Sequence, residues 1–218
     1  MNIAIGSDHR GGKVAYRLVK DLLLRDHYAD LTFDARPSND SMVGAFMIEG
    51  AAVSDSFDEG DAAEPPRVYP IKYGDKQEED EVEYAASLSE AIELVDPELS
   101  AEARRELRVD YPDVAAAVAS AVSEGRADMG VLVCGTGVGM GIVANKFKGV
   151  RAAVCYNEVA AELSRRHNDA NVLCVSGEFL SVPAIESLVR LWLTAPYDGG
   201  RHAPRVAKIA KLEEQTGL

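Results

Sequence analysis

The sequence contains no hydrophobic run that approaches the ~20 apolar residues needed to cross a bilayer. Its first ten residues, MNIAIGSDHR, lack a basic region followed by an apolar stretch and a small-residue cleavage site, so no signal peptide is expected. Basic residues are few: 23 Lys and Arg stand against 36 Asp and Glu, for a formal net charge of −13. This charge disfavours binding to a phosphate backbone, so no nucleic-acid partner is expected. A small anionic substrate stays compatible, because a few local cations can hold one.

Cysteine is also scarce, with Cys134, Cys155 and Cys174 as the complete set. An odd number without close pairs argues against a disulfide framework and against a zinc knuckle. A reducing, cytoplasmic location fits this pattern. The 218 residues are 47% hydrophobic, which is enough for one substantial core, and a single domain over 1–218 is expected.

Strands and helices are predicted to alternate over most of the chain. Apolar runs predict strands, and four-residue apolar spacing predicts helices. The expected strands are 2–6, 31–33, 131–133, 152–155 and 171–175, and the expected helices are 11–27, 113–125, 158–166, 182–194 and 204–214. This alternation indicates an α/β fold with a parallel sheet of about five strands.

The segment 35–108 differs from the rest of the chain. It holds 19 acidic and 7 basic residues, a net charge of −12, and includes Pro65 and Pro66. Two short helices are expected near residues 87–94 and after Pro97. We interpret it as a partly ordered insertion at about 35–108. Its charge is most simply a solvated surface, and the alternative is a lid or an oligomer arm near the active site.

Ligands of parallel α/β sheets bind beyond the carboxyl ends of the strands, which selects the loops 6–12, 134–141 and 156–169. The second loop reads CGTGVGMG. Its glycines let backbone N–H groups turn toward an anion, either a phosphate or an enediolate oxygen. Its spacing matches neither a dinucleotide-binding fingerprint nor a P-loop. Taken alone, such a segment is equally consistent with a tight turn between a strand and a helix that binds no ligand.

Cys134 stands where a strand ends and a glycine-rich helix start begins. A helix N-terminus favours the thiolate form of a cysteine and so permits proton exchange near neutral pH. Cys134 is therefore a candidate proton-transfer residue. Cys155 and Cys174 lie inside apolar strands and are expected to be buried packing residues.

The histidines and C-terminal arginines add further candidates. His9 follows Asp8 at the predicted ligand edge, whereas His27 is expected at the surface. His167 lies at the end of a predicted helix. The helix dipole favours a histidine there even if it is a solvated residue without a functional role. Arg201 and Arg205 are four residues apart, flank His202, and could clamp a phosphate from one helix face; the alternative is a surface pair.

Several of these segments resemble the ribose-5-phosphate isomerase B / galactose-6-phosphate isomerase family. They occur in the same order as in that family: Gly6-Ser-Asp-His9, Asp110-Tyr-Pro-Asp113, Val133-Cys-Gly-Thr-Gly-Val-Gly139, Ala144-Asn-Lys146, His167-Asn168, Asn171-Val-Leu173, and Gly199-Gly-Arg-His202 with Arg205-Val206. The resemblance covers roughly residues 1–34 and 109–218. The combination is more specific than any single motif.

The resemblance implies an aldose–ketose isomerase with a Rossmann-like three-layer α/β/α core. Members use no metal and no organic cofactor. They act on sugar phosphates such as ribose 5-phosphate or galactose 6-phosphate. They form homodimers, sometimes homotetramers, with active sites shared across the dimer interface.

The resemblance also assigns roles to residues. Cys134 moves a proton between C1 and C2, Thr136 belongs to the same site, and the backbone of 135–139 holds the enediolate oxygen. His167 opens the sugar ring, with Asp8 close to the ring oxygens. The substrate-binding positions are His9, Tyr111, Gly135, Gly137, Gly139, Asn168, Arg201, His202 and Arg205, of which His9, Arg201 and Arg205 match phosphate-binding positions.

Three departures from the family bear on the substrate. The connection between Phe33 and Asp110 is far longer than usual. Glu178 follows the Asn-Val-Leu strand where ribose-5-phosphate members carry an arginine. Arg10 and Gly12 also depart from the residues often found after the Asp-His pair. We hypothesise that Arg10, or Arg67 and Lys72, supplies the missing positive charge.

Two other functions fit parts of the pattern. A cysteine-dependent hydrolase or transferase would use Cys134 with a histidine and form a covalent thioester. A sugar-phosphate-binding regulatory module would bind ligand without turnover. The joint presence of Cys134, Thr136 and His167 favours the isomerase.

Overall fold

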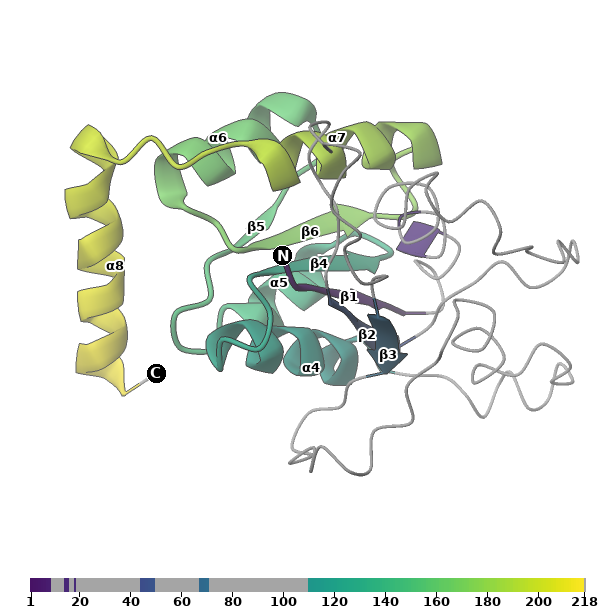
Figure 1. Ribbon diagram of the computed structural model, residues 1–218, viewed down its shortest axis with the longest axis horizontal. Coiled ribbons are helices and arrows are strands. Elements are labelled where there is room, and N and C mark those ends of the chain that lie inside the picture. The colour runs from purple at the N-terminus through teal and green to yellow at the C-terminus, as the bar shows by residue number, and fades with distance from the viewer. Residues whose placement is uncertain (9–13, 16–17, 19–43, 50–66, 71–109, 218) are drawn as a thin grey trace, which may run out of the picture.

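The computed structural model (Figure 1) describes residues 1–8, 14–15, 18, 44–49, 67–70 and 110–217. In this part of the chain six strands form one sheet in the order β3-β2-β1-β4-β6-β5. The strands are β1 (Ile3–Ser7), β2 (Gly44–Glu49), β3 (Arg67–Pro70), β4 (Met129–Cys134), β5 (Ala152–Val154) and β6 (Val172–Ser176). The strand predicted at 31–33 and the helices predicted near 87–94 and after Pro97 lie outside the described residues.

The sheet is mainly parallel, as the alternation of strands and helices predicted. β4 pairs in parallel with both β1 and β6, and β5 continues the parallel set at one edge. β2 and β3 add two antiparallel strands beside β1. Both strands fall inside the segment interpreted as an insertion, so the described sheet has six strands where about five were predicted.

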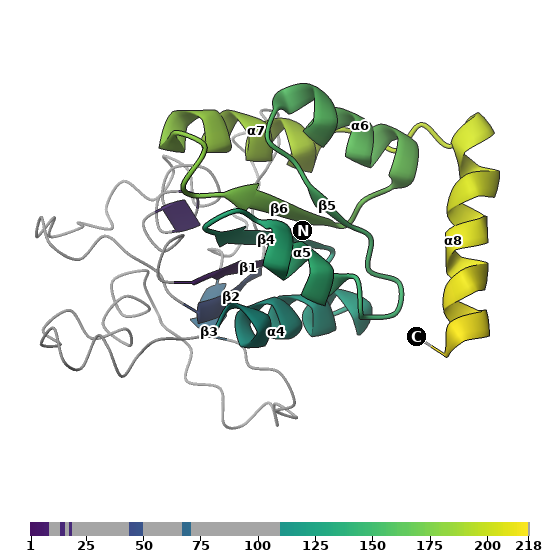
Figure 2. The same ribbon diagram turned by 180° about the vertical axis from the view of Figure 1, so that it is seen from behind.

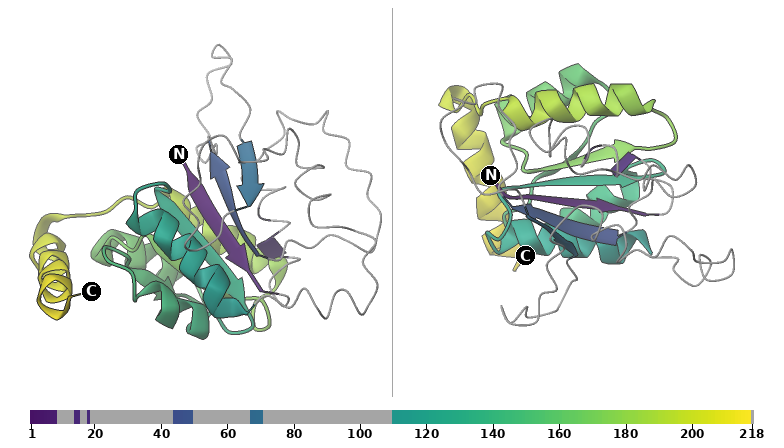
Figure 3. Two further views of the ribbon diagram at one scale, coloured as in Figure 1. Left: turned by 90° about the horizontal axis from the view of Figure 1, so that it is seen from below. Right: turned by 45° about the vertical axis from the view of Figure 1, so that its right-hand side comes forward.

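Two helical layers cover the sheet (Figure 3), which confirms the three-layer arrangement. α4 (Tyr111–Ser123) and α5 (Val138–Ala144) pack on one face, and α6 (Glu158–Asn168) and α7 (Val182–Thr194) on the other. Strand side chains alternate between these faces. In β4, Val131 and Val133 join the α6/α7 core, whereas Leu132 and Cys134 join the α4/α5 core.

The ends of the helices follow from local sequence. The side chain of Asn157 accepts a hydrogen bond from the Ala160 N–H at 2.9 Å and caps α6. α4 ends at Ser123, and Gly125 follows with φ of 73°. A glycine suits this left-handed position because it has no Cβ.

The last helix, α8 (Ala203–Thr216), follows a short 3-10 turn, η3 (Gly200–His202), and has no buried residue. It lies past the amino ends of the parallel strands, on the far side from their carboxyl ends (Figures 1 and 2). The Gly149 N–H donates to a carboxylate oxygen of Glu213 at 3.1 Å and links α8 to the body. No helix in the described ranges is both long enough and apolar enough to span a bilayer.

Asn145, directly after α5, binds the edge strand β5. Its amide oxygen accepts from the Ala152 N–H at 2.9 Å, and its amide nitrogen donates to the carbonyls of Ala152 and Gly141, both at 3.0 Å. One side chain thus supplies the pairing that a further strand would give to β5. The strand leads directly to Tyr156, at the carboxyl edge of the sheet.

Replacing Asn145 with Ala is expected to destabilise the protein by about 1–3 kcal/mol, because three hydrogen bonds are lost at once. Urea unfolding measures this cost, with the exposed neighbour Lys146→Ala as the matched control. Equal stability of the two variants would show that the edge strand does not depend on Asn145.

Candidate active site

The register of the parallel strands places Cys134 beside Asp8. Ser7 pairs with Val133, and the Asp8 N–H donates to the Val133 carbonyl at 3.3 Å. Asp8 and Cys134 therefore leave neighbouring strands at the same level, at the carboxyl edge of the sheet. Both are nearly enclosed, with 7% and 5% exposure respectively. A carboxyl group and a thiol are thus placed together where parallel sheets bind ligands.

The glycine-rich loop binds the cysteine sulfur directly. The Gly137 N–H donates to the Sγ of Cys134 at 3.1 Å. This bond holds the sulfur beside Gly137, the residue that directly precedes α5. Gly137 has φ of 79°, and a Cβ there would lie 3.2 Å from the backbone of Val175. Both its conformation and its close packing therefore require glycine.

The end of β6 holds this loop in place. The Gly177 N–H donates to the Cys134 carbonyl at 2.8 Å, and the Glu178 N–H to the Gly135 carbonyl at 3.2 Å. The buried hydroxyl of Ser176 also donates to the Gly135 carbonyl. These bonds fix the position of the thiol before any ligand binds. They also place the exposed Glu178 at the rim of the loop.

Two tyrosines border the cysteine loop. A Cβ on Gly139 would lie 2.7 Å from the Tyr111 ring, so glycine at this position makes room for the ring. The Tyr156 hydroxyl donates to the Thr136 carbonyl at 2.8 Å, and its ring lies 6.2 Å from that of Phe179. The sequence reasoning found Tyr111 but missed Tyr156. Its place directly after a predicted strand, at the carboxyl edge, could have identified it.

The other two thiols are buried, as predicted. Cys155 and Cys174 are 2% and 0% exposed. Burial raises the pKa of both thiols, so both stay protonated at neutral pH. Cys134 is the thiol placed at the ligand edge.

A second group of predicted residues gathers around two stacked imidazoles. The His167 and His202 rings lie 4.0 Å apart and nearly parallel, at 9°. The Arg201 Nε donates to the His202 Nε2 at 3.3 Å. Burial, followed by the positive charges of His167, Arg201 and Arg205, lowers the pKa of His202, so its ring is neutral at pH 7.

This second group lies at the opposite end of the strands from Cys134. α6 begins after β5 at the carboxyl edge of the sheet and runs back to the amino edge. Of the segment 156–169, which was predicted to lie at the ligand-binding edge, only the first residues do so. Arg151, just before β5, donates to the Asn168 carbonyl at 3.2 Å. The six residues of β4, which rise ~3.3 Å each, separate the two groups by about 16 Å.

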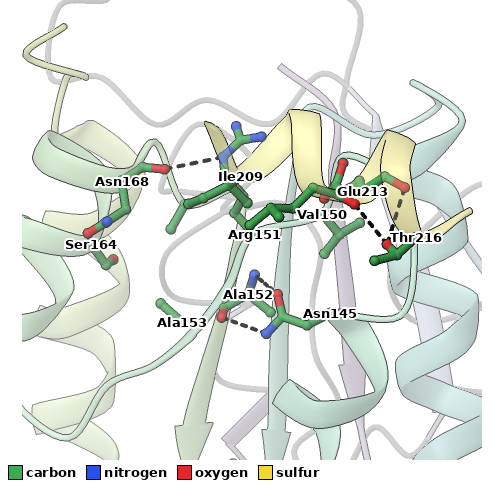
Figure 4. Close-up of a pocket in the computed structure, with 12 residues that line it drawn as sticks. Asn145, Val150, Arg151, Ala152, Ala153, Ser164, Asn168, Ile209, Glu213 and Thr216 are labelled. Carbon is green, nitrogen blue, oxygen red and sulfur yellow. Dashed lines mark hydrogen bonds between the residues drawn. The ribbon is translucent and has the colours of Figure 1, made fainter. Parts of the chain in front are cut away.

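A cleft of about 600 Å³ opens beside the second group, between α8 and the amino ends of the strands (Figure 4). Asn168 borders it from α6, and Ile209 and Leu212 from α8. The polar side chains of Arg151 and Asn145 in its wall are already bonded to backbone groups. The cleft is therefore separate from the cysteine loop and offers few free donors.

Asp198 completes the second group, and the sequence reasoning missed it. Its Oδ1 accepts from the Arg166 Nε at 3.1 Å, and the Arg166 guanidinium lowers its pKa. One oxygen of Asp198 and one nitrogen from each ring of His167 and His202 lie within 4.8 Å of one another. Its position directly before the Gly199-Gly-Arg-His202 motif could have identified Asp198 as a member of this group.

These three side chains could hold a metal ion by residue type, but their geometry does not favour it. Nearly parallel stacked rings direct their in-plane lone pairs side by side and not toward one point. Asp198 already binds Arg166, and Arg201 and Arg205 add positive charge. The group is better suited to an anion than to a cation.

The structure thus places the predicted residues in two groups. The cysteine group contains Cys134, Gly135, Thr136, Gly137, Gly139, Asp8 and Tyr111. The histidine group contains His167, Asn168, Arg201, His202 and Arg205. His9, Arg10 and Gly12 lie outside the described residues.

An α/β sheet with a thiol beside a glycine-rich loop at its carboxyl edge is compatible with the class of enzymes that transfer a proton next to a carbonyl. Comparison with known proteins narrows this class. The family model described as Ribose/Galactose Isomerase matches residues 76–209. The chain therefore belongs to the ribose/galactose isomerase family.

Individual relatives agree with this assignment. The chain is 48% identical over 108 residues to ribose-5-phosphate isomerase B of Escherichia coli, covering 50% of this chain and 72% of that protein. It is 41% identical to D-erythrulose-4-phosphate isomerase of Pectobacterium atrosepticum, covering 48% and 69%. A solved ribose-5-phosphate isomerase B of Clostridium thermocellum is 46% identical over 50% of this chain and 74% of its own, with a TM-score of 0.49.

Replacing Gly137 with Ala is expected to destabilise the protein more than Gly125→Ala and to slow alkylation of Cys134. Both glycines have positive φ, 79° and 73°, so each substitution costs about 1 kcal/mol in backbone strain. Only Gly137 also packs against backbone and donates to the sulfur. Urea unfolding and the rate of iodoacetamide labelling at one pH measure the two effects. Identical unfolding and labelling of the two variants would contradict the close packing of Gly137 against the end of β6.

Proposed function

We propose that this protein is a cytosolic isomerase that interconverts a phosphorylated aldose and its ketose, with Cys134 as the proton-transfer residue. The observation that carries the proposal is the Gly137 N–H on the Cys134 sulfur, beside the buried Asp8. This arrangement places a thiol, a backbone donor and a carboxyl group together at the carboxyl edge of the sheet. The family to which the chain belongs supports the same reaction.

The chemistry requires a base next to one carbon, an acid next to the neighbouring carbon, and a partner for the enediolate oxygen. The Cys134 thiolate removes the proton from C2 of the aldose, and the resulting thiol returns it to C1, while the proton of the C2 hydroxyl moves to the oxygen on C1. Backbone N–H groups of 135–139 stabilise the enediolate, as in an oxyanion hole. Thr136, half-buried in the same loop, would bind a substrate hydroxyl.

The substrate is proposed to be a pentose, hexose or tetrose phosphate. The names of two relatives specify ribose 5-phosphate and D-erythrulose 4-phosphate. Arg201 and Arg205 in the histidine group supply the cations for a phosphate. Glu178 at the rim of the cysteine loop works against a dianion unless its carboxylate turns away. A panel of sugars with and without phosphate is therefore the appropriate assay.

A second copy of the chain is proposed to complete the site. In one chain the histidine group lies about 16 Å from Cys134, too far for both to act on one small sugar. Exposed apolar side chains surround the cysteine loop, as a contact surface between subunits would require. They are Tyr111, Val138, Ile142, Tyr156, Val159 and Phe179. A homodimer, or a tetramer built from it, would bring each cysteine group to a partner's histidine group.

Replacing Cys134 with Ala is expected to lower kcat at least about 10²-fold on the best sugar phosphate of the panel, because the acid/base group is lost. Affinity for the sugar should change far less. Cys155→Ala is the matched control: it also removes a thiol, but a buried, protonated one, and should keep activity within a few-fold. Full activity of Cys134→Ala would refute the assigned role.

Mixing two inactive variants tests the shared site. Cys134→Ala and His167→Ala are each expected to lack activity, whereas a heterodimer of the two has one intact site and one doubly altered site. After subunit exchange, random pairing should restore about a quarter of wild-type activity in an equimolar mixture. Exchange without any recovery would show that Cys134 and His167 act within one chain.

A further inference from the structure

The histidine group contains a carboxylate to which no role has been given. Asp198 is attached to α6 twice: its N–H donates to the Arg166 carbonyl at 3.0 Å, and its Oδ1 accepts from the Arg166 Nε at 3.1 Å. Its side chain remains 31% exposed. The carboxylate is therefore fixed in position and still in contact with solvent, within 4.8 Å of both imidazoles.

The charges around the imidazoles make this carboxylate significant. Burial, then the charges of His167, Arg201 and Arg205, lowers the pKa of His202, whereas the Asp198 carboxylate raises it and lies within 4.8 Å of both rings. Two cationic imidazoles stacked at 4.0 Å would repel each other, so a proton on one ring disfavours a proton on the other. Without this carboxylate, the charges of Arg201 and Arg205 would lower the pKa of His202 further.

We propose that Asp198 is a positioning residue that keeps one proton on the His167–His202 pair, so that the pair can open the cyclic form of the sugar. This rests on the proposed function, because it concerns the ring opening that precedes isomerisation. His202 is the neutral member, since its Nε2 accepts from Arg201. His167 then carries the proton.

The step balances without any further reactant. The hydroxyl on C1 gives its proton to water, and the bond between C1 and the ring oxygen breaks. The electron pair of that bond goes to the ring oxygen, which takes a proton from the His167 imidazolium. Water then returns a proton to His167. A tetrose 4-phosphate needs no such step, because the esterified O4 cannot close a five-membered ring.

The first experiment follows the ¹⁵N chemical shifts of the imidazoles with pH in the protein without ligand. The chain has four histidines, and His167→Gln and His202→Gln spectra assign the pair. Asp198→Asn is expected to move the titration midpoint of the pair about one pH unit lower, and Asp198→Glu to restore most of it.

The matched control is Glu162→Gln. Glu162 is the second carboxylate that binds Arg166: its Oε1 lies 3.0 Å from Nη1 of the guanidinium. It is not part of the group formed by Asp198 and the two imidazoles. Its removal should leave the midpoint within about 0.3 unit of wild type. Equal shifts in Asp198→Asn and Glu162→Gln, or no shift in either, would overturn the proposal.

A second experiment separates ring opening from general damage. Asp198→Asn is expected to lower kcat/KM for ribose 5-phosphate about tenfold and to leave that for D-erythrose 4-phosphate within about twofold. An equal loss on both sugars would assign Asp198 a structural role only. If the wild-type protein isomerises no sugar phosphate, the proposed function fails, and the chemical-shift titration still decides whether Asp198 controls the pair.

Discussion

The parallel pairing of β4 with both β1 and β6 is the constraint on which the rest of the site depends. It aligns Ser7 with Val133 and Cys134 with Ser176, so three strands end at one level. The residues that follow these strand ends are Asp8 after β1, the cysteine loop after β4 and Glu178 after β6. Because β6 also binds the Cys134 and Gly135 carbonyls, the loop geometry is set by the sheet itself.

The same pairing explains why one chain carries the two groups separately. Helices that connect parallel strands begin at the carboxyl edge and end at the amino edge. His167 and Asn168, at the end of α6, must therefore lie away from Cys134. The Asp198–Arg166 pair attaches Arg201 and His202 to that same end. Each chain thus has a thiol beside a glycine-rich loop at one end of the sheet and a group of arginines and imidazoles at the other.

Sequence reasoning reached the features that depend on local chemistry. The strand at 131–133, the helix at 158–166 and the glycine-rich turn after Cys134 each reflect a short-range requirement, and the structure has all of them. It missed β2, which pairs with β1 far along the chain, and β3, which pairs with β2. It also expected the whole of 156–169 at the ligand edge, because it did not follow α6 back across the sheet. Asp198 and Tyr156 bind partners far along the chain, Arg166 and Thr136, and their positions beside a motif and after a predicted strand indicate their places but not these contacts.

The most direct test of the account is the incorporation of deuterium from heavy water into the sugar during turnover, resolved by carbon position. If the Cys134 thiol carries the proton between C1 and C2, it can exchange with solvent, and deuterium should appear at those carbons in wild type and disappear in Cys134→Ala. Isomerisation and deuterium incorporation that persist at the wild-type rate in Cys134→Ala would contradict the central role of Cys134.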